Sequence, residues 1–448
     1  MDHILSSDWL AVRIHDRTIK GIALGTATLI SSGAIPVGCR LPAVRDLASA
    51  LDVSPATVSA AWGQLRRQKV IAGTGRNGVW VCANIVTPRP ARFEAIGNFG
   101  GNIIADLTLA APDVAYLPNL QQALTQGALA ANVNSYRREP ISQRLQGVVQ
   151  PRWPYAAEAF LAADGGFDAM YQTLQTLIMP GAPVAIEDPT ATRLLDMLDN
   201  LGAEIIAVPC DEAGPGLAGL EAALRRQPVA FIYQPRTHST TGHTVTRQRA
   251  DAMTARLAAA ATLVIEDDGI GELSRHPVYS LGRALPDRTV HIRSFSKAYG
   301  PDLRLAVISG SHDIIRRIQS VRNFGASWTS RILQEAVAWM IEDGATQEVI
   351  TAAKDCYAAR RRALVQALAQ RGMILPDRDG LSIWLPVMSE QYALVTLAAH
   401  GIAVTPGKRH SLGDSRFIRV STSLLTADRV GLVADALMLA CQHEGSAA

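Results

Sequence analysis

The sequence predicts a protein of two parts, a small helical domain with a β-hairpin and then a large α/β domain. Two short helices joined by a tight turn lie near the N-terminus, ahead of a Gly-rich hairpin. A segment rich in Pro and Gly follows and has neither helical nor strand periodicity. Beyond it, short β-branched runs alternate with amphipathic stretches, which is typical of a sheet covered by helices on both faces. We therefore expect a head over residues 1–83, a linker over 84–102 and an α/β domain over 103–448.

The head contains the signals for helices and a hairpin. Ser54 and Pro55 supply an N-cap and a proline at the first helical position, which predicts a helix start. Asn77 and Gly78 form a dipeptide that favours a tight hairpin turn, so the strands around it are expected to form a wing. The helices are expected over 17–33, 41–48 and 54–68, and the hairpin strands over 70–72 and 79–81.

Charge and cysteine usage restrict the classes of function. The head carries nine Lys and Arg against five acidic residues, a net charge of +4, whereas the whole chain has only +3. A basic head on a nearly neutral body is suited to contact with nucleic acid. The five cysteines are scattered without a CxxC pair, which argues for a reducing cytoplasm and against a disulfide framework or a metal site. No apolar run is long enough to span a membrane and no secretion signal is recognisable, so we expect a cytoplasmic protein with no membrane partner.

The large domain carries a set of residues suited to pyridoxal phosphate. Asp267 follows the apolar run 263–265, and some thirty residues later Ser294 precedes Lys297, with Arg304 beyond. A lysine can form a Schiff base with this cofactor, and a carboxylate keeps the pyridine nitrogen protonated. Hydroxyls and an arginine can hold its phosphate.

The head resembles the winged helix of GntR-type regulators through the stretch LPAVRDLASALDVSPATVSAAWGQLRRQKVI. The resemblance implies that Arg45 grips a phosphate or a guanine edge and that Ser54 and Thr57 face the groove of double-stranded operator DNA. It implies that Arg76, on the wing, reaches the DNA backbone or minor groove. The alternative is a small structural helical domain whose arginines are incidental.

The segment SFSKAYGPDLRLAVISG resembles the lysine motif of fold-type I aminotransferases. With the head, this makes nearly the whole chain similar to the MocR subfamily of GntR-type regulators. The resemblance implies a large mixed sheet and a smaller C-terminal α/β subdomain over about 330–448. The implied site residues are Lys297 for the Schiff base, Asp267 for the pyridine nitrogen, Ser294, Ser296, Arg304, Gly165 and Gly166 for the phosphate, and Arg419 for the carboxylate of an effector.

Several positions depart from the family pattern. No aromatic residue follows Pro189, and Gly269 lies where a tyrosine is expected near the cofactor ring. Phe167 could supply the aromatic ring that stacks on the cofactor. Ser239 is a candidate substitute for a polar cofactor ligand. His410, beside two basic residues, is expected in a surface loop.

These departures favour a sensor over a catalyst, so no catalytic residue is assigned. The resulting expectation is a homodimeric regulator, head-to-tail and domain-swapped by resemblance, whose aminotransferase-like domain senses pyridoxal phosphate, an amino acid or an amine. Two alternatives stay open: a working aminotransferase with an appended DNA-binding domain, or a regulator whose large domain has lost the cofactor.

Overall fold

The computed structural model describes residues 5–31, 34–73, 78–82, 90–94 and 103–441. The chain divides into two compact units, Met1–Arg89 and Pro90–Ala448. Within the described ranges, none of the helices combines the length and apolar composition that crossing a bilayer requires.

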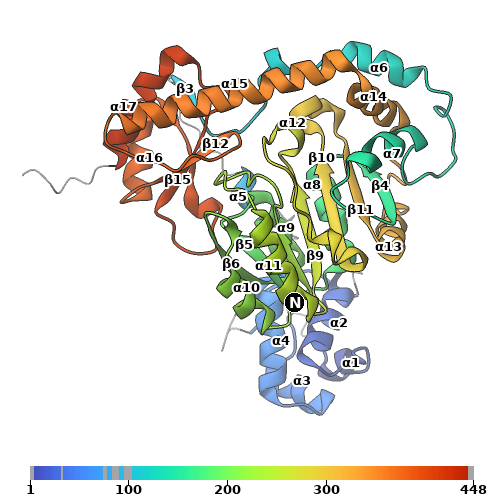
Figure 1. Ribbon diagram of the computed structural model, residues 1–448. Helices are drawn as coiled ribbons and strands as arrows, with labels where there is room; N and C mark the ends of the chain where they lie inside the picture. Colours follow the sequence, from blue (N-terminus) through green and yellow to red (C-terminus); the bar gives the residue numbers. More distant parts are fainter. Residues whose placement is uncertain (1–4, 32–33, 74–77, 83–89, 95–102, 442–448) are drawn as a thin grey trace, which may run out of the picture. The chain divides into compact units, whose positions relative to one another are not determined.

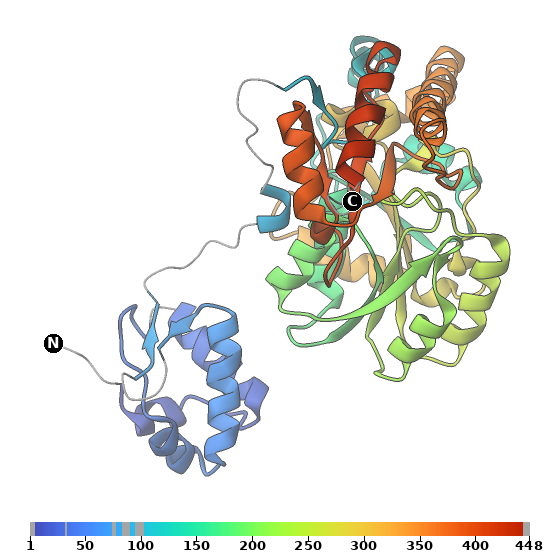
Figure 2. The ribbon, with the colours of Figure 1, turned by 90° about the vertical axis from the view of Figure 1, so that its left-hand side faces the viewer.

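The N-terminal unit is a winged helix-turn-helix (Figure 2). Ser54 caps the recognition helix, because its Oγ accepts a hydrogen bond from the Thr57 backbone N–H at 3.1 Å and Pro55 takes the first helical position. The preceding helix ends at Asp52, which adopts the left-handed conformation. The elements are α1 (Ser7–Ala11), α2 (Ile19–Ser31), α3 (Val44–Leu51), α4 (Pro55–Arg67), β1 (Ile71–Ala72) and β2 (Trp80–Val81).

A single apolar core holds the head together. Leu47, Trp62 and Leu65 are fully buried between the helices, and Ile71 pairs with Val81 across the antiparallel wing. The apolar positions of α3 and α4 therefore face the core, which leaves the N-terminal surface of α4 exposed.

The large unit is built on an eight-stranded mixed sheet, which confirms the predicted α/β class. The strand order is β4-β11-β10-β9-β8-β5-β6-β7, and the strands from β10 to β6 in this order run parallel. β11 runs antiparallel to both of its neighbours. The strands are β4 (Ala159–Ala163), β5 (Pro183–Asp188), β6 (Glu204–Asp211), β7 (Gly214–Pro215), β8 (Ala230–Tyr233), β9 (Leu263–Asp268), β10 (Thr289–Ser294) and β11 (Ala306–Gly310).

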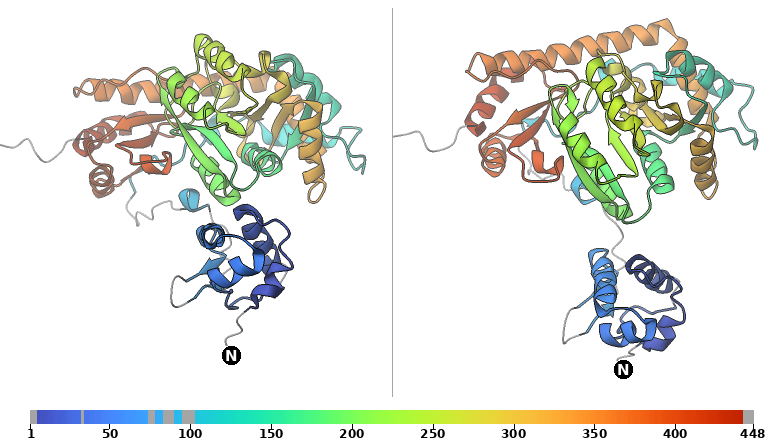
Figure 3. Two further views of the ribbon diagram at one scale, coloured as in Figure 1. Left: turned by 90° about the horizontal axis from the view of Figure 1, so that it is seen from below. Right: turned by 60° about the horizontal axis from the view of Figure 1, so that its bottom comes forward.

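Helices cover both faces of this sheet (Figures 1 and 3). Alternate strand residues such as Ile265 and Val264 point into different apolar clusters, so each face has its own core. One face is covered by α8 (Gly166–Leu177), α9 (Thr192–Leu201) and α13 (His312–Arg322). The other is covered by α6 (Leu120–Ala128), α7 (Gln143–Val149), α10 (Leu217–Leu224), α11 (Arg247–Ala258) and α14 (Arg331–Glu342).

The C-terminal part has a separate core. The long helix α15 leads into it, and α16 and α17 pack against the three-stranded sheet β12-β15-β14 (Figure 1). A short strand from the start of the unit, β3 (Ala105–Asp106), also joins it by pairing with β13. The elements are α15 (Gly344–Ala369), β12 (Ser382–Pro386), α16 (Glu390–Ala399), β13 (Ile402–Ala403), β14 (Thr405–Pro406), β15 (Phe417–Ser421) and α17 (Val430–Cys441).

A buried polar network anchors the carboxyl end of β9. Glu266 is fully buried and accepts hydrogen bonds from Tyr233 Oη at 2.8 Å, Ser280 Oγ at 2.7 Å and the Leu281 backbone N–H at 2.8 Å. His291 Nδ1 lies 2.7 Å from Oε2, the carboxylate oxygen that also accepts from Ser280. Each of these groups would lose its partner without the carboxylate, so Glu266 fixes the position of the strand end.

Glu266→Ala is expected to destabilise the large unit by about 3–5 kcal/mol, because it leaves several buried donors unpaired. Urea unfolding of the full chain, followed by far-UV circular dichroism, measures the loss. Glu204→Ala is the control, because it breaks only an exposed pair with Arg226 and should change the free energy of unfolding by less than about 1 kcal/mol. Equal effects of the two substitutions would contradict the structural role of Glu266.

Candidate functional site

The candidate site lies where the parallel strands of the large sheet end. Ligands of open α/β sheets bind at this edge, beyond the carboxyl ends of the strands. Asp267 is near the end of β9, and Ser294 ends β10. The short helix α12 (Ser296–Tyr299) follows at once and carries Lys297. The sequence motif thus puts the lysine next to the strand that bears the carboxylate.

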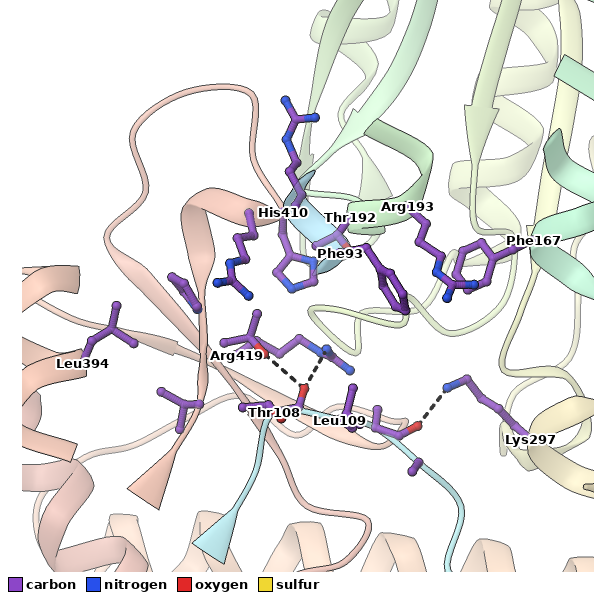
Figure 4. Close-up of a pocket in the computed structure, with 17 residues that line it drawn as sticks. Phe93, Thr108, Leu109, Phe167, Thr192, Arg193, Lys297, Leu394, His410 and Arg419 are labelled. Carbon is purple, nitrogen blue, oxygen red and sulfur yellow. Dashed lines mark hydrogen bonds between the residues drawn. The ribbon is translucent and has the colours of Figure 1, made fainter. Parts of the chain in front are cut away.

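Lys297 points into a pocket of about 410 Å³ (Figure 4). Its Nζ donates a hydrogen bond to the Ala110 carbonyl oxygen at 2.9 Å. Burial, followed by the positive charge of Arg419, lowers the pKa of this lysine to about 8, and the negative charge of Asp267 opposes both effects. A substantial fraction of Lys297 is therefore an unprotonated amine near neutral pH, which is the form that attacks a carbonyl carbon.

Asp267 differs from the acids on either side of it. Strand alternation turns Asp268 to the opposite face, where Arg236 Nη2 and Arg293 Nε each lie 2.9 Å from its carboxylate and hold its pKa far below the usual range. Asp267 has no hydrogen-bonding partner among the described residues. Burial, followed by the charges of Glu187 and Asp268, raises the pKa of Asp267 to about 7. A cationic partner would relieve this cost.

The chain forms an anion cradle at the start of α8. Gly165, with φ of +105°, leads into the helix, and no side chain caps its first backbone N–H groups. A Cβ on Gly165 would lie 2.9 Å from Arg304 Nη2, and one on Gly166 would lie 2.9 Å from Ser294 Cβ. The buried Oγ of Ser296 has no hydrogen-bonding partner. Free N–H groups at a helix start, an arginine and an orphaned hydroxyl are suited to a phosphate group.

The pocket is rich in cations and contains no carboxylate among its described lining residues. Arg193, Arg409 and Arg419 line it together with Lys297, and none of the four has an ion pair in the described part of the chain. Arg419 donates from Nε to Ser382 Oγ at 3.1 Å, and burial lowers its pKa to about 10. An anionic occupant would give these groups the partner that the protein does not supply.

Arg193 is a pocket residue that the sequence patterns did not indicate. Its guanidinium lies over the ring of Phe93 at 3.6 Å and over that of Phe167 at 4.7 Å. Burial lowers the pKa of Arg193, as does the nearby charge of Arg304. Phe167 lines the pocket, but one face of its ring is taken by Arg193 (Figure 4). No sequence motif indicates this arrangement at the start of α9, because Phe93 comes from a segment that is distant in the chain.

That segment is α5 (Ala91–Glu94), a helix within the predicted linker. The Asp196 carboxylate of α9 accepts hydrogen bonds from the backbone N–H groups of Arg92 at 3.2 Å and of Phe93 at 3.0 Å. Arg92 also pairs with Asp199. Four residues are too few for a periodic signal, so the sequence could not predict this docked helix.

His410 is not in an exposed surface loop, contrary to the expectation from its basic neighbours. It is 4% exposed and lines the pocket. Its Nδ1 lies 3.0 Å from the Thr190 carbonyl oxygen, and burial lowers its pKa to about 3. Ser239 lies outside the pocket lining, and its backbone N–H donates to Gln234 Oε1 at 2.8 Å.

The head exposes a polar surface at the helix-turn-helix. Arg45 is exposed on α3, and Ser54 is exposed at the start of α4. The hydroxyls of Ser54 and Thr57 are 2.8 Å apart, so they form a unit at the N-terminus of the recognition helix. Arg76 lies outside the described residues.

Two family models match the chain in this order. Residues 24–81 match the gntR family of bacterial regulatory proteins, and residues 113–437 match aminotransferase class I and II. The chain is 31% identical over 413 residues to the vitamin B6 salvage pathway transcriptional repressor PtsJ of Salmonella typhimurium, an alignment that covers 90% of this chain and 94% of the relative. The chain belongs to the MocR subfamily of GntR-type regulators.

Other comparisons agree with this membership. The HTH-type transcriptional regulator TauR of Rhodobacter capsulatus is 25% identical over 428 residues, which cover 85% of this chain and 86% of that one. Kynurenine aminotransferase of Pyrococcus horikoshii has the same fold as the large unit, with a TM-score of 0.69 and 19% identity over 78% of this chain and 93% of that one. This MocR protein is thus a DNA-binding transcription regulator with an aminotransferase-like domain.

The lowered pKa of Lys297 predicts unusual reactivity toward an amine-directed reagent. Labelling of Lys297 should rise as the pH passes through about 8, well below the value of about 10.4 for a lysine in a model peptide, and the exposed Lys408 serves as the reference for reagent reactivity in the same sample. Arg419→Gln should move the Lys297 profile to higher pH, because it removes a like charge. Peptide mass spectrometry measures both lysines in one sample. Identical profiles would refute the assigned environment.

Proposed function

We propose that this regulator holds pyridoxal phosphate in its aminotransferase-like domain and uses the occupied pocket to control operator binding. The observation that supports this most is the convergence of Lys297, with its low pKa, and Asp267, which lacks a partner, beside the glycine cradle at Arg304. Each group lacks what the cofactor would provide: a carbonyl for the amine, a pyridinium for the carboxylate and a phosphate for the cradle.

The residues divide into three contacts with the cofactor. Lys297 would attach to it covalently, and Asp267 would pair with the ring nitrogen. The phosphate would be bound by the α8 N-terminus at Gly165 and Gly166, by Ser294, Ser296 and Arg304, and additionally by Arg193. When bound, pyridoxal phosphate supplies an electrophilic carbon and an electron-withdrawing ring.

Arg419 would bind the carboxylate of an effector. It lies in the same pocket as Lys297, and its charge acts on that lysine. The name of PtsJ, a repressor of vitamin B6 salvage, makes pyridoxal phosphate itself a candidate effector, whereas Arg419 is suited to an amino acid. Both fit a sensor, since an effector need only bind one conformation of the regulator more tightly than another.

Helix α5 is the element of the large unit through which the pocket would act on the head, because it lines the pocket and comes first in the chain of that unit. Arg92 and Phe93 line the pocket, and α5 begins only two residues after the N-terminal unit ends at Arg89. An occupant that draws Arg193 away from Phe93 would weaken the docking of α5. The chain that leads to the DNA-binding head would then no longer be held to α9 through α5. A head-to-tail homodimer, as the family resemblance implies, would present two heads to a two-fold operator.

Lys297→Ala and Arg45→Ala should separate the two activities. Lys297→Ala should abolish the absorbance of protein-bound pyridoxal phosphate and reduce its effect on DNA binding to less than about twofold, against a coupling of about 5–150-fold in the native protein. Arg45→Ala should keep the cofactor absorbance and weaken DNA binding with a shallower salt dependence.

The probe is a double-stranded fragment selected from a random library with the full-length protein, and gel shift measures its affinity. Unchanged cofactor binding in Lys297→Ala would refute the assigned lysine. Conversion of the cofactor to its amino form by a panel of amino acids would favour the alternative of a working aminotransferase.

Phe93→Ala should disconnect the pocket from DNA binding. We expect unchanged cofactor absorbance at saturation and unchanged DNA affinity without cofactor, but a cofactor effect reduced to less than about twofold, since coupling needs a contact that differs between states. Phe324→Ala is the matched control, because this phenylalanine is 96% exposed. A full cofactor effect in Phe93→Ala would exclude α5 as the connection.

A further inference from the structure

A second cluster of functional side chains, none of which lines the cofactor pocket, lies at the ends of β5 and β6 and in the loop after β8. Glu187, Cys210 and His243 each offer one ligand atom, and these atoms all lie within 4.8 Å of one another. Glu187 and His243 are 1% and 3% exposed, and Cys210 is half-buried. Burial, followed by the negative charge of Glu187, raises the pKa of the Cys210 thiol well above its usual value, and the hydrogen bond that the Asp188 backbone N–H donates to the sulfur opposes this rise.

Two of these side chains have buried polar atoms without a partner. Glu187 Oε1 accepts a hydrogen bond from the Gln234 backbone N–H at 2.9 Å and lies 3.4 Å from His238 Nε2, but Oε2 has no hydrogen-bonding partner in the part of the chain that the structure describes. His243 Nε2 also has none. Buried polar atoms in a folded protein are normally satisfied, so a pair of orphans facing one cluster indicates an additional occupant.

The hydrogen bonds around His243 are consistent with a free lone pair on Nε2. His238 Nδ1 accepts from the backbone N–H groups of Thr240 at 3.3 Å and Thr241 at 3.0 Å, so this nitrogen carries no proton. The Thr241 hydroxyl lies 3.0 Å from that nitrogen and 2.7 Å from His243 Nδ1. When the hydroxyl donates to His238, it must accept from His243 Nδ1–H. The lone pair of His243 is then on Nε2, the orphaned atom.

We propose that Glu187, Cys210 and His243 form a binding site for a divalent transition metal of the zinc class. A carboxylate, a thiolate and an imidazole are zinc ligands, and the two negative charges neutralise a buried Zn²⁺. Tetrahedral ligands at about 2.0–2.3 Å from zinc are about 3.3–3.8 Å apart, so small side-chain rotations close the cluster around the ion. Binding releases the Cys210 thiol proton to solvent and leaves a fourth position for water.

Thr241 and His238 act as positioning residues in this site. The Thr241 hydroxyl orients His243 through Nδ1, which is the arrangement that metal-bound histidines usually have. His238 stacks on His243 with ring centroids 4.5 Å apart and faces Glu187 through Nε2. The ligands are separated by 23 and 33 positions in the chain, so no sequence spacing could indicate the site.

Metal binding by the full-length protein tests this proposal. After treatment with a chelator, the protein should bind one equivalent of Co²⁺ per chain with a thiolate-to-cobalt charge-transfer band, and Zn²⁺ should displace it. Cys210→Ser should abolish that band, whereas Cys356→Ser, at a half-buried cysteine outside the cluster, should keep it. His243→Gln should weaken Zn²⁺ binding by about 100-fold or more, measured by competition with a chromophoric chelator.

Thr241→Val keeps all three ligands and removes only the orienting hydroxyl. It should weaken Zn²⁺ binding by about 10–100-fold. If circular dichroism shows that a ligand variant does not fold, the Zn²⁺ affinity of Thr241→Val tests the site in its place. Absence of stoichiometric binding by the native protein would overturn the proposal and indicate a hydrogen bond from His243 to Glu187 instead. Equal affinities of Thr241→Val, His243→Gln and the native protein would overturn it as well.

Discussion

The large unit places four cations in one pocket without pairing them with carboxylates, and this imbalance determines its chemistry. Lys297, Arg193, Arg409 and Arg419 line one cavity, and none of them has an ion pair in the described ranges. Taking charge out of water is costly unless a counter-charge is near, and the lowered pKa values of Lys297 and Arg419 express that cost. An anion that enters relieves it, so the empty and occupied states differ in free energy. A sensor needs, in addition, that this anion bind one conformation of the protein more tightly than another.

Glu266 and Asp268 of β9 have hydrogen-bonding partners, whereas the acid between them has none among the described residues. Along β9 the alternation of a strand sends Glu266 and Asp268 to one face, where hydrogen bonds and arginines neutralise them. Asp267 points to the other face and stays without a partner. Of these three consecutive acids, Glu266 and Asp268 stabilise the strand end, and Asp267 is left available for a ligand. The hydrogen bonds of the buried network fix the position of the Asp267 carboxylate. Helices α4 and α8 differ in the same way. The Ser54 side chain caps α4, whereas no side chain caps the first N–H groups of α8 at Gly165.

Sequence patterns predicted those parts of the site that follow one another closely in the chain. Asp267, Ser294 and Lys297 were found because strand ends and a short motif lie together, and the winged helix was found because its capping and turn residues are local. Residues that meet only through the fold were missed. Phe93 reaches Arg193 from a four-residue helix with no periodicity, and β3 pairs with a strand about 300 positions later. His410 was misplaced because its neighbours are basic, whereas its own ring packs against Trp384 inside the domain.

The departures from the aminotransferase pattern follow from what a regulator requires. Catalysis depends on holding the cofactor ring within a narrow range of orientations, which is why a stacking aromatic residue and a nearby tyrosine matter to an enzyme. Binding depends mainly on the anchors, the role that we propose for Lys297, Asp267 and the glycine cradle. In this chain the aromatic ring of Phe167 instead packs on Arg193, which also contacts Phe93 of α5. The aromatic surface beside the cofactor site thus contacts the segment that leads to the DNA-binding head. In the proposed function, a fold that orients a ring for chemistry would instead couple the occupancy of its pocket to the position of helix α5.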